Sequence, residues 1–487
     1  MVGADLHVFP DRGPVYLLTE HRSARPSPDD NWLTAQPSRL LNARFQVVDF
    51  TGRDRELSRL EAWRDRLGPR LSALWLHGPG GQGKSRLAAQ FAARSAMAGW
   101  KIVDATHSAV TVLPPPASQD MRLESATGLL MIVDYADRWP PSHLAWLFSN
   151  ALLHRQIPTR LLLLARSVKA WPAVRASLEH MQSDAVDLPL QPLTDQAGRS
   201  DRDRMFTVAR DCFAAGYGVA DAVIGPPSSL HRPEFGLVLA LHIAALATVD
   251  AHVHGDRPPE DMAHLSSYLL DRERKHWTQL HTNQYEGLDF RTSPSVMSRT
   301  VFTAALSGAT THPKGASLLS ALHLDSTDRV LADHAMCYPP TETGTVLEPL
   351  YPDRLAEDFL ALALPGHSVT GYSAESWAPS TVEALTRRDA NGEPPEHILR
   401  ALTFLTAAAA PGRWPHVSTH LRAILRADPT LAVTAGSAVL TALADIDLDS
   451  GLLEAVEASF PEDRHTDLDN GYRRHHSAAQ CGTPEQN

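Results

Sequence analysis

The segment GPGGQGKS, residues 78–85, combines closely spaced glycines with a lysine and a hydroxyl side chain. Glycines let the backbone turn sharply and aim successive N–H groups at phosphate oxygens, and a helix that follows adds the positive end of its dipole. Lys84 would bring a compact charge to the terminal phosphates, and the Ser85 hydroxyl would bind a magnesium ion. The pattern G-x-x-x-x-G-K-[ST] therefore predicts a Walker A loop, which binds a nucleotide through these residues: Gly78, Gly80, Gly81, Gly83, Lys84, Ser85 and Arg86.

The residues on both sides of this loop agree with that interpretation. ALWLH, residues 73–77, is an apolar run of strand length, and SRLAAQFAARSAMAGW, residues 85–100, has apolar residues at helical spacing. A chance glycine-rich turn is the alternative. The order strand, loop, helix favours the phosphate loop, because a short motif has meaning only in its structural context.

Two carboxylates follow a second apolar run and could complete the magnesium site. LLMIVDYAD, residues 129–137, begins with five apolar residues, which is typical of a strand buried on both faces. Asp134 stands at the carboxyl end of this strand, where ligands bind in an open parallel sheet, and is the predicted magnesium ligand. Asp137 is the candidate that orients or deprotonates the attacking water. A helix N-cap or a solvated loop acid is the alternative role for Asp137.

A third apolar run, TRLLLLARS at residues 159–167, ends in an arginine. Arg166 would face the same crevice and contact the γ-phosphate through a bidentate hydrogen bond, with a surface ion pair as the alternative. KIVDA at 101–105 and AVDLPLQPL at 185–193 add two more strands. Strands that alternate with helices over residues 73–193 predict an α/β fold with a parallel sheet and right-handed crossovers.

The overall composition limits the class of protein. A length of 487 residues predicts roughly two to four domains. A formal net charge of -11 argues against a constitutive electrostatic grip on nucleic acid or on anionic lipid, although a basic face could still be hidden in that total. The three cysteines form no CxxC pair, the N-terminus lacks the apolar run of a signal peptide, and no window reaches about 18 apolar residues. We therefore expect a soluble, cytoplasmic protein without a membrane partner.

With these motifs in place, residues 45–365 resemble the STAND class of P-loop NTPases, which includes the NACHT and NB-ARC groups, and most closely its actinobacterial members. VVDFTGRDREL, residues 47–57, looks like the family motif whose preceding segment packs on the adenine, with Gly52 and Arg53 at the matching positions. VDYAD is similar to the NACHT form of the Walker B strand, although Arg138 stands where many members carry another acid. Arg166 matches the family's sensor arginine.

Later segments carry the resemblance further. FGLVLALHIAAL, residues 235–246, is similar to the GLPLAL motif with Val238 in place of the adenine-contacting proline. Residues 343–362 look like a β-wing and closing helix, and 351–353 read Tyr-Pro-Asp where plant and animal relatives have Met-His-Asp. The resemblance implies a P-loop NTPase core followed by a helical lid, a winged helix and a C-terminal helical region. The predicted boundaries are 1–44 for an N-terminal connector, 45–200 for the NTPase domain, 201–290 for the lid, 291–365 for the winged helix, 366–460 for a helical array and 461–487 for a mobile tail.

The resemblance also implies a function. It predicts ATP or ADP with Mg²⁺ as cofactors, slow hydrolysis, and a signal-transduction switch whose nucleotide state controls conformation, homo-oligomer formation in the ATP state, and contact with an effector protein of unknown identity. A DNA-associated ATPase similar to the AAA+ origin-recognition loaders is the alternative, and the net negative charge argues against it. A binding-only pseudo-ATPase is a further alternative.

Overall fold

A computed structural model describes residues 16–21, 28–107, 122–123, 125–181, 183–193, 195–282, 289–446 and 448–460. The predicted mobile tail, 461–487, lies outside these residues, as does most of the predicted N-terminal connector up to residue 27. The chain forms two compact units. Unit 1 comprises Met1–Arg25, Arg53–Pro79 and Lys84–Gln191, and unit 2 comprises Pro26–Gly52, Gly80–Gly83 and Pro192–Asn487. The finer domain boundaries inside these units stay predictions.

Unit 1 is built on a six-stranded sheet with the order β1-β3-β4-β5-β2-β6. The five strands from β2 to β6 are parallel, and β1 pairs antiparallel with β3 at one edge. This confirms the predicted parallel sheet and adds an antiparallel edge strand to it. The strands are β1 (Tyr16–Glu20), β2 (Leu71–His77), β3 (Trp100–His107), β4 (Gly128–Val133), β5 (Thr159–Ala165) and β6 (Asp184–Pro189).

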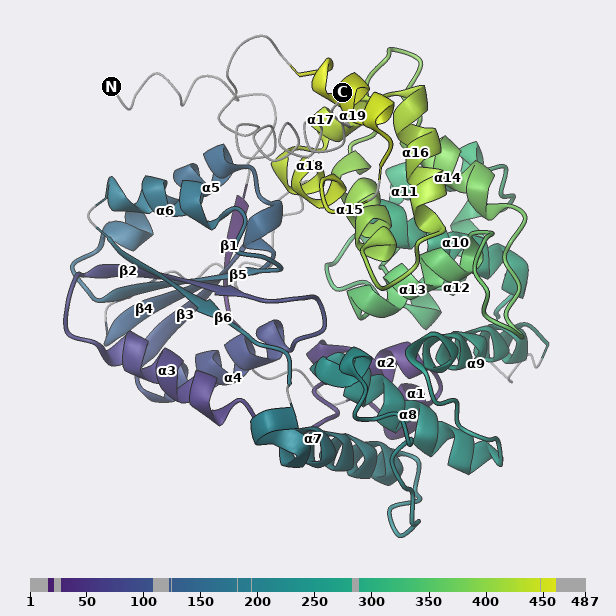
Figure 1. Ribbon diagram of the computed structural model, residues 1–487, viewed down its shortest axis with the longest axis horizontal. Coiled ribbons are helices and arrows are strands. Elements are labelled where there is room, and N and C mark those ends of the chain that lie inside the picture. Colours follow the sequence, from purple (N-terminus) through teal and green to yellow (C-terminus); the bar gives the residue numbers. More distant parts are fainter. Residues whose placement is uncertain are drawn as a thin grey trace, which may run out of the picture. The chain divides into compact units, whose positions relative to one another are not determined.

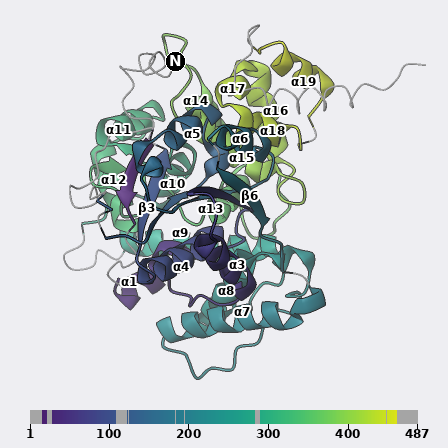
Figure 2. The ribbon, with the colours of Figure 1, turned by 90° about the vertical axis from the view of Figure 1, so that its left-hand side faces the viewer.

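Helices cover both faces of this sheet, so the central strands have no solvent face. In Figure 1, α3 (Asp54–Asp65) and α4 (Lys84–Met97) lie on one side of the sheet, and α5 (Pro141–Phe148) and α6 (Trp171–Glu179) lie on the other. Every residue of β4 and β5 is buried, which explains their continuous apolar runs. The same layers appear in Figure 2, where the sheet is seen from its side.

A buried arginine fixes the C-terminal end of α3 to the sheet. Arg160, the second residue of β5, donates hydrogen bonds from its guanidinium to the backbone carbonyls of Trp63, Arg64 and Arg66. These carbonyls belong to the last turn of α3 and the residue after it, where backbone acceptors have no partner inside the helix. The contact holds α3 in a defined place on the sheet.

The described residues of unit 2 are helical apart from one short two-stranded ribbon. Its first part contains α1 (Asp30–Thr34), α2 (Pro37–Leu41), α7 (Asp195–Gly216), α8 (Val238–His254) and α9 (Met262–Thr282). Then come α10 (Pro294–Ser307), β7 (Thr310–Thr311), α11 (His312–Ala321), α12 (Thr327–Cys337), β8 (Thr345–Val346) and α13 (Asp353–Ala363). The strands β7 and β8 pair antiparallel. Helix, strand, two helices and a returning strand form the arrangement of a winged helix, so the α/β fold class and the helices after the sheet are as predicted.

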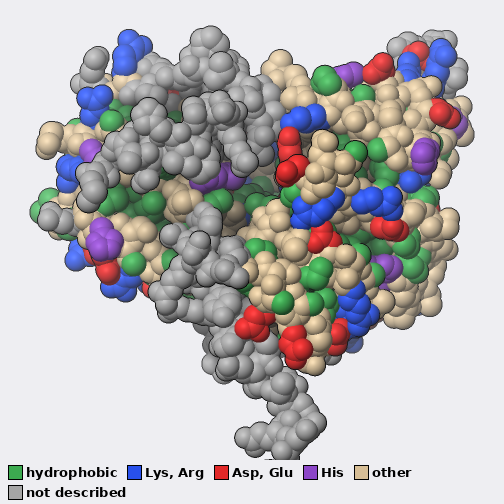
Figure 3. Space-filling view, turned by 90° about the horizontal axis from the view of Figure 1, so that it is seen from above, with side chains coloured by type: hydrophobic (Ala, Val, Ile, Leu, Met, Phe, Trp, Pro, Cys, Tyr) green, Lys and Arg blue, Asp and Glu red, His purple; other side chains and the backbone are tan. Residues whose placement is uncertain are grey.

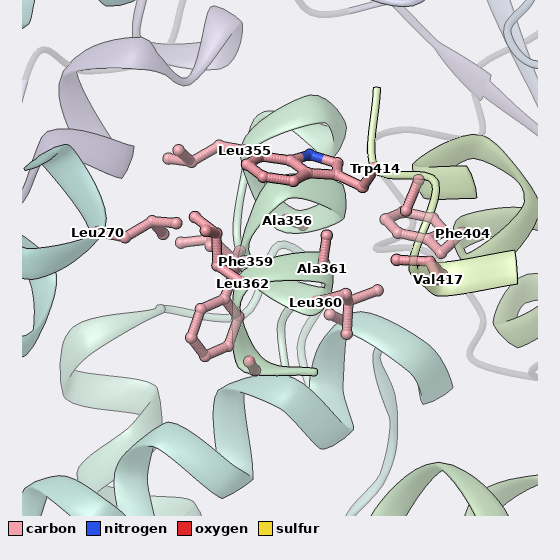
Figure 4. Packing of buried hydrophobic residues seen from close by; sticks show 14 of the residues in the cluster. Leu270, Leu355, Ala356, Phe359, Leu360, Ala361, Leu362, Phe404, Trp414 and Val417 are labelled. Carbon is pink, nitrogen blue, oxygen red and sulfur yellow. The ribbon is translucent and has the colours of Figure 1, made fainter. Parts of the chain in front are cut away.

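The last part of unit 2 packs on α13. It contains α14 (Ala378–Thr386), α15 (Ile398–Ala409), α16 (Val417–Ala427), α17 (Thr430–Thr434), α18 (Ser437–Leu443) and α19 (Ser450–Glu457). Figure 4 shows Phe359 and Leu360 of α13 in the same apolar cluster as Phe404 of α15 and Trp414. All four side chains are buried, and this burial joins the predicted helical array to the winged helix.

Burial of a histidine in unit 2 predicts a loss of stability in acid. His334 of α12 is 1% exposed, and burial lowers its pKa to about 3. Because this value lies below that of the unfolded chain, about 6.5, the unfolded state binds the proton more readily, so stability falls as the pH drops from about 6.5 toward 3. We expect His334 to lower the free energy of unfolding by about 1.4 kcal/mol per pH unit in that window.

The measurement compares urea unfolding of the wild type and of His334→Phe at pH 7, 6 and 5. Phenylalanine keeps a ring beside Tyr338, whose ring centroid lies 5.1 Å from that of His334. Other titrating groups affect both proteins alike, so the difference in slope isolates His334. Equal slopes for the two proteins would contradict the expectation.

Candidate functional site

The glycine loop begins where three parallel strands end. The backbone N–H of Gly78 donates to Ala165 O at the end of β5, at 3.2 Å, and Leu190 N, after β6, donates to His77 O at 2.7 Å. A Cβ atom on Gly78 would lie 2.7 Å from the carbonyl oxygen of Leu190. The position therefore has no room for a side chain, and this close approach is one physical reason for glycine in the first position of the motif.

The middle of the loop needs glycine for its backbone conformation. Gly81 and Gly83 have φ of 85° and 88°, in the left-handed region that other residues avoid. Within unit 2, Leu239 N donates to Gly81 O at 2.9 Å, and Val238 lies 3.8 Å from where a Cβ on Gly83 would be. The N-terminal end of α8, the segment similar to GLPLAL, therefore packs directly on Gly81 and Gly83. Gly80 precedes Gly81 in the same loop.

Lys84 starts α4 and turns its ammonium back over the loop. Its Nζ donates to Gly78 O at 2.6 Å and to Pro79 O at 3.0 Å. Burial lowers the pKa of Lys84 to about 8, and the nearby Arg166 guanidinium acts in the same direction, while Asp134 and Asp137 act against it. The charged groups selected from the sequence thus lie close enough to influence one another. Arg86 follows in the first turn of α4.

The predicted magnesium ligands meet at the carboxyl edge of the sheet. Ser85 Oγ donates to Asp134 Oδ2 at 2.8 Å. Asp134 follows β4, which is separated from β2 by β5 alone, so the sheet order brings together two residues 49 positions apart. The backbone N–H of Tyr135 donates to Asp134 Oδ1 at 2.8 Å. Burial raises the pKa of the Asp134 carboxyl, and the hydrogen bonds from Ser85 and Tyr135 oppose that effect.

This pair fits a magnesium ion in ligand type and in spacing. Mg²⁺ prefers oxygen ligands in an octahedron at about 2.1 Å, which places neighbouring ligands about 2.9 Å apart. The 2.8 Å between Ser85 Oγ and Asp134 Oδ2 is close to that separation. Mg²⁺ usually keeps several waters and binds substrate phosphates as well, so two protein oxygens are sufficient.

Asp137 and Arg166 are also brought together. Asp137 lies in a short 3-10 turn, Ala136–Arg138, and its Oδ2 accepts a hydrogen bond from the backbone N–H of Arg166 at 2.8 Å. The N-cap of that turn is Tyr135, so Asp137 does not have the N-cap role that was its alternative. Its Oδ1 atom is buried and has no hydrogen-bond partner among the described residues. The contact fixes the backbone of Arg166 directly after β5, the strand that lies between β2, which precedes the glycine loop, and β4, which precedes Asp134.

Gly52 and Arg53 form a left-handed turn that leads into α3. Their φ values are 70° and 59°, and a Cβ on Gly52 would lie 2.3 Å from Met205 Cε. Arg53 donates to Gln191 O at 2.9 Å and to Glu56 at 3.0 Å. In this structure Arg53 therefore ties the start of α3 to the segment after β6. Its predicted place beside the adenine stays a prediction.

Two features of the site were not expected from the sequence. The guanidinium of Arg138 lies 4.0 Å from the ring centroid of Tyr135, which has a φ of 53° directly after Asp134. In unit 2, Arg354, in the first turn of α13, has its Cδ 3.8 Å from the position of a Cβ on Gly81. No motif points to Arg354, because its nearness to the loop arises only when α13 packs in the folded chain.

None of the helices in the described part of the chain combines the length and the apolar character needed to cross a membrane.

Comparison with known proteins gives only distant structural likenesses. No family model matches the sequence, and no curated protein does. NtrX from Brucella abortus, solved in complex with ADP, aligns at a TM-score of 0.31 and 17% identity over 51% of this chain and 65% of that chain. The Aeropyrum pernix ORC2 protein, solved as ADPNP-ADP complexes, aligns at 0.32 and 16% over 66% and 96% of the two chains. Cdc6p from Pyrobaculum aerophilum aligns at 0.29 and 12% over 77% and 96%.

Proposed function

We propose that the protein is an ATP-binding and slowly hydrolysing switch of the STAND type, whose nucleotide state controls its conformation and self-assembly and thereby its contact with an effector. The observation that supports this most directly is the 2.8 Å contact between Ser85 and Asp134. It joins the glycine loop after β2 to the carboxylate after β4 at one edge of a parallel sheet, which is where such sheets bind ligands.

Each residue of the site has a separate role in binding or hydrolysing the nucleotide. Backbone N–H groups of residues 81–85 bind phosphate oxygens, and the Lys84 ammonium exchanges its two carbonyl partners for them. Ser85 and Asp134 would hold a magnesium ion, which when bound would neutralise charge on the phosphates. Asp137 orients the attacking water through its buried Oδ1, while its Oδ2 stays on the Arg166 backbone. Positioning and charge supply most of what phosphoryl transfer needs.

A nucleotide can shift the conformation only through contacts that differ between states. The hydrogen bond from Leu239 N to Gly81 O links the loop to α8, and Arg354 brings α13 to the same glycine. A change in the conformation of the loop would therefore alter its contacts with α8 and α13 in unit 2. Arg166 is the residue that we expect to distinguish a triphosphate from a diphosphate, because it directly follows β5, the strand between β2 and β4.

Arg166→Ala is expected to lower the ratio of ATP affinity to ADP affinity by about tenfold, the loss of one charge-assisted contact worth about 1.4 kcal/mol. The substitution keeps the backbone N–H that Asp137 accepts from, so the site should stay assembled. Competition with a fluorescent nucleotide measures both affinities. Arg175→Ala, which removes an exposed arginine of α6 paired with Glu179, is the matched control. An unchanged ratio would leave Arg166 with a structural role only.

The alternative of a DNA-associated ATPase has one observation in its favour. Unit 1 contains 20 Lys and Arg and 15 Asp and Glu, a net positive charge inside an acidic chain. On the part of the face in Figure 3 that the structure describes, however, basic and acidic side chains lie interspersed. Titration of a labelled duplex separates the two proposals, because tight, salt-sensitive binding would favour the DNA-associated ATPase.

The binding-only pseudo-ATPase is tested by an assay of phosphate release. If the wild type releases phosphate no faster than Lys84→Ala does, the protein binds the nucleotide without hydrolysing it.

A further inference from the structure

A small cavity in unit 2 lies between the segment that carries α1 and α2 and the segment that joins α12 to α13. Its volume is about 30 Å³, which is room for a chemical group of about two or three non-hydrogen atoms. Trp32, Ser38 and Arg39 line it from the first segment, and Tyr338 and Tyr351 line it from the second. None of the residues assigned to the nucleotide site lines this cavity, so it is a separate feature of the molecule.

A buried carboxylate holds the two sides of the cavity together. Glu273 of α9 accepts hydrogen bonds from the backbone N–H of Ser38 at 2.7 Å and from the hydroxyl of Tyr338 at 2.8 Å. It also accepts one from Gln36 Nε2 at 2.8 Å. The walls are therefore fixed by the fold, and a ligand would bind without the entropic cost of ordering them.

A buried arginine brings a positive charge to the cavity. The guanidinium of Arg39 lies 4.0 Å from the ring centroid of Trp32, and Nη1 donates to the backbone carbonyl of Trp32 at 2.7 Å. Its other hydrogen bonds also go to backbone carbonyls, those of Met336 and Cys337, and it makes no ion pair with a carboxylate of the described residues. Burial lowers the pKa of Arg39. An anion beside this guanidinium would offset the cost of burying its charge.

The other ionisable side chains of the lining leave the positive charge in excess. Arg44 adds a second positive charge, and Glu348 is the one carboxylate among the residues that line the cavity. Both oxygens of Glu348 accept hydrogen bonds from Thr341, one from its N–H and one from its hydroxyl. Burial raises the pKa of the Cys337 thiol to about 12, so this side chain is neutral at pH 7. The cavity therefore favours an anion over a cation or a neutral molecule.

A buried hydroxyl in the lining needs a hydrogen-bond partner. Ser38 is 4% exposed, and its Oγ has no hydrogen-bond partner among the described residues. Leaving a buried polar atom unsatisfied costs free energy, and most such atoms in native proteins have a partner. Because Ser38 lines the cavity, an acceptor atom bound there could receive this hydrogen bond. Phe45 and Tyr351 line the same cavity, so a short apolar tail on the ligand would contact their rings.

We propose that this cavity binds the carboxylate of a small organic acid, with Arg39 supplying the opposite charge and Ser38 a hydrogen bond. A carboxylate matches the cavity in size, and its planar shape suits a guanidinium. The inference goes beyond the proposed function, because it gives the protein a second ligand. Tyr351 lies two residues before α13, whose Arg354 approaches Gly81, so the ligand would contact the segment that leads to the glycine loop.

The test titrates propionate into the whole chain without nucleotide and measures its affinity by saturation-transfer NMR. Propionamide is the uncharged analogue of the same shape, and inorganic phosphate is an anion of a different shape. We expect propionate to bind at least tenfold more tightly than either. Ser38→Ala should bind propionate at least fivefold more weakly than the wild type, about the effect of one lost hydrogen bond. Ser298→Ala removes another buried hydroxyl without a described partner, in α10 and outside the lining, and should bind propionate normally.

A measurement of stability separates a ligand contact from a structural role of Ser38. Alanine removes the unsatisfied hydroxyl and keeps the backbone N–H that donates to Glu273. We therefore expect urea unfolding without propionate to show Ser38→Ala at least as stable as the wild type, although it binds propionate more weakly. Arg39→Gln should lose at least tenfold in affinity, and Ser38→Ala tests the site alone if the arginine variant does not fold.

The result does not depend on the nucleotide site, because no nucleotide is present in the titration. Failure of the protein to bind ATP would leave the inference unchanged. No saturable binding of propionate, equal affinities for propionate and propionamide, phosphate that binds as tightly as propionate, or wild-type propionate affinity in Ser38→Ala would each overturn it.

Discussion

Lys84→Ala should bind ATP at least 100-fold more weakly than the wild type, a loss of about 2.7 kcal/mol or more. The reason lies in the geometry of the loop. The Lys84 ammonium lies over the carbonyls of Gly78 and Pro79, at 2.6 and 3.0 Å, and so projects into the curve of backbone that would surround the phosphates. Alanine keeps the start of α4 and removes the one lysine charge in the loop. Equilibrium titration with a fluorescent ATP analogue measures the effect.

A matched control separates charge at this point from loss of a lysine in general. Lys101→Ala removes another lysine of unit 1, which pairs with Glu20 between β3 and β1. This variant should bind ATP as the wild type does. If Lys84→Ala kept the wild-type affinity while folding normally, the glycine loop would not be a phosphate site.

Asp134→Asn is expected to lower magnesium-dependent phosphate release at least 100-fold, about 2.7 kcal/mol in the barrier. Asparagine is close to the same size and can still accept a hydrogen bond from Ser85, so the edge of the sheet should keep its shape. It has no negative charge to hold Mg²⁺. We therefore expect nucleotide binding without metal to change little, and the tightening that Mg²⁺ causes in the wild type to be lost.

Phosphate release and metal-dependent nucleotide binding are measured on both proteins, with Asp184→Asn as the control. Asp184 is the first residue of β6, pairs with Arg66 and lies at the other end of the strands. Normal magnesium dependence in Asp134→Asn would remove this carboxylate from the metal site, and a different residue would have to hold the ion.

The core of the fold follows from local sequence. β2, β4 and β5 each contain a continuous apolar run, because strands covered on both faces have no solvent side. The strands expected in the segments 73–77, 129–137 and 159–167 are present as β2, β4 and β5. The glycine loop could also be predicted from the sequence, because the backbone at Gly81 and Gly83 has a positive φ, a conformation that favours glycine. These features depend on neighbours within a few residues.

Features that depend on packing between distant parts of the chain could not be predicted from the local sequence. The pairing of β1 with β3 joins residues about 90 positions apart, and its antiparallel sense has no local signal. The left-handed backbone of Tyr135 is unexpected for an aromatic residue, and no motif in the sequence indicates it. The approach of Arg354 to Gly81 likewise requires α13 and α8 to be folded together.

A crystal structure of the protein with Mg²⁺ and a non-hydrolysable ATP analogue tests the central claim most directly. The account predicts that the phosphates lie within hydrogen-bond reach of the backbone N–H groups of residues 81–85 and of Lys84 Nζ, and that the ion lies about 2.1 Å from Ser85 Oγ with Asp134 beside it. A nucleotide bound elsewhere, or a metal ion that contacts neither Ser85 nor Asp134, would contradict it.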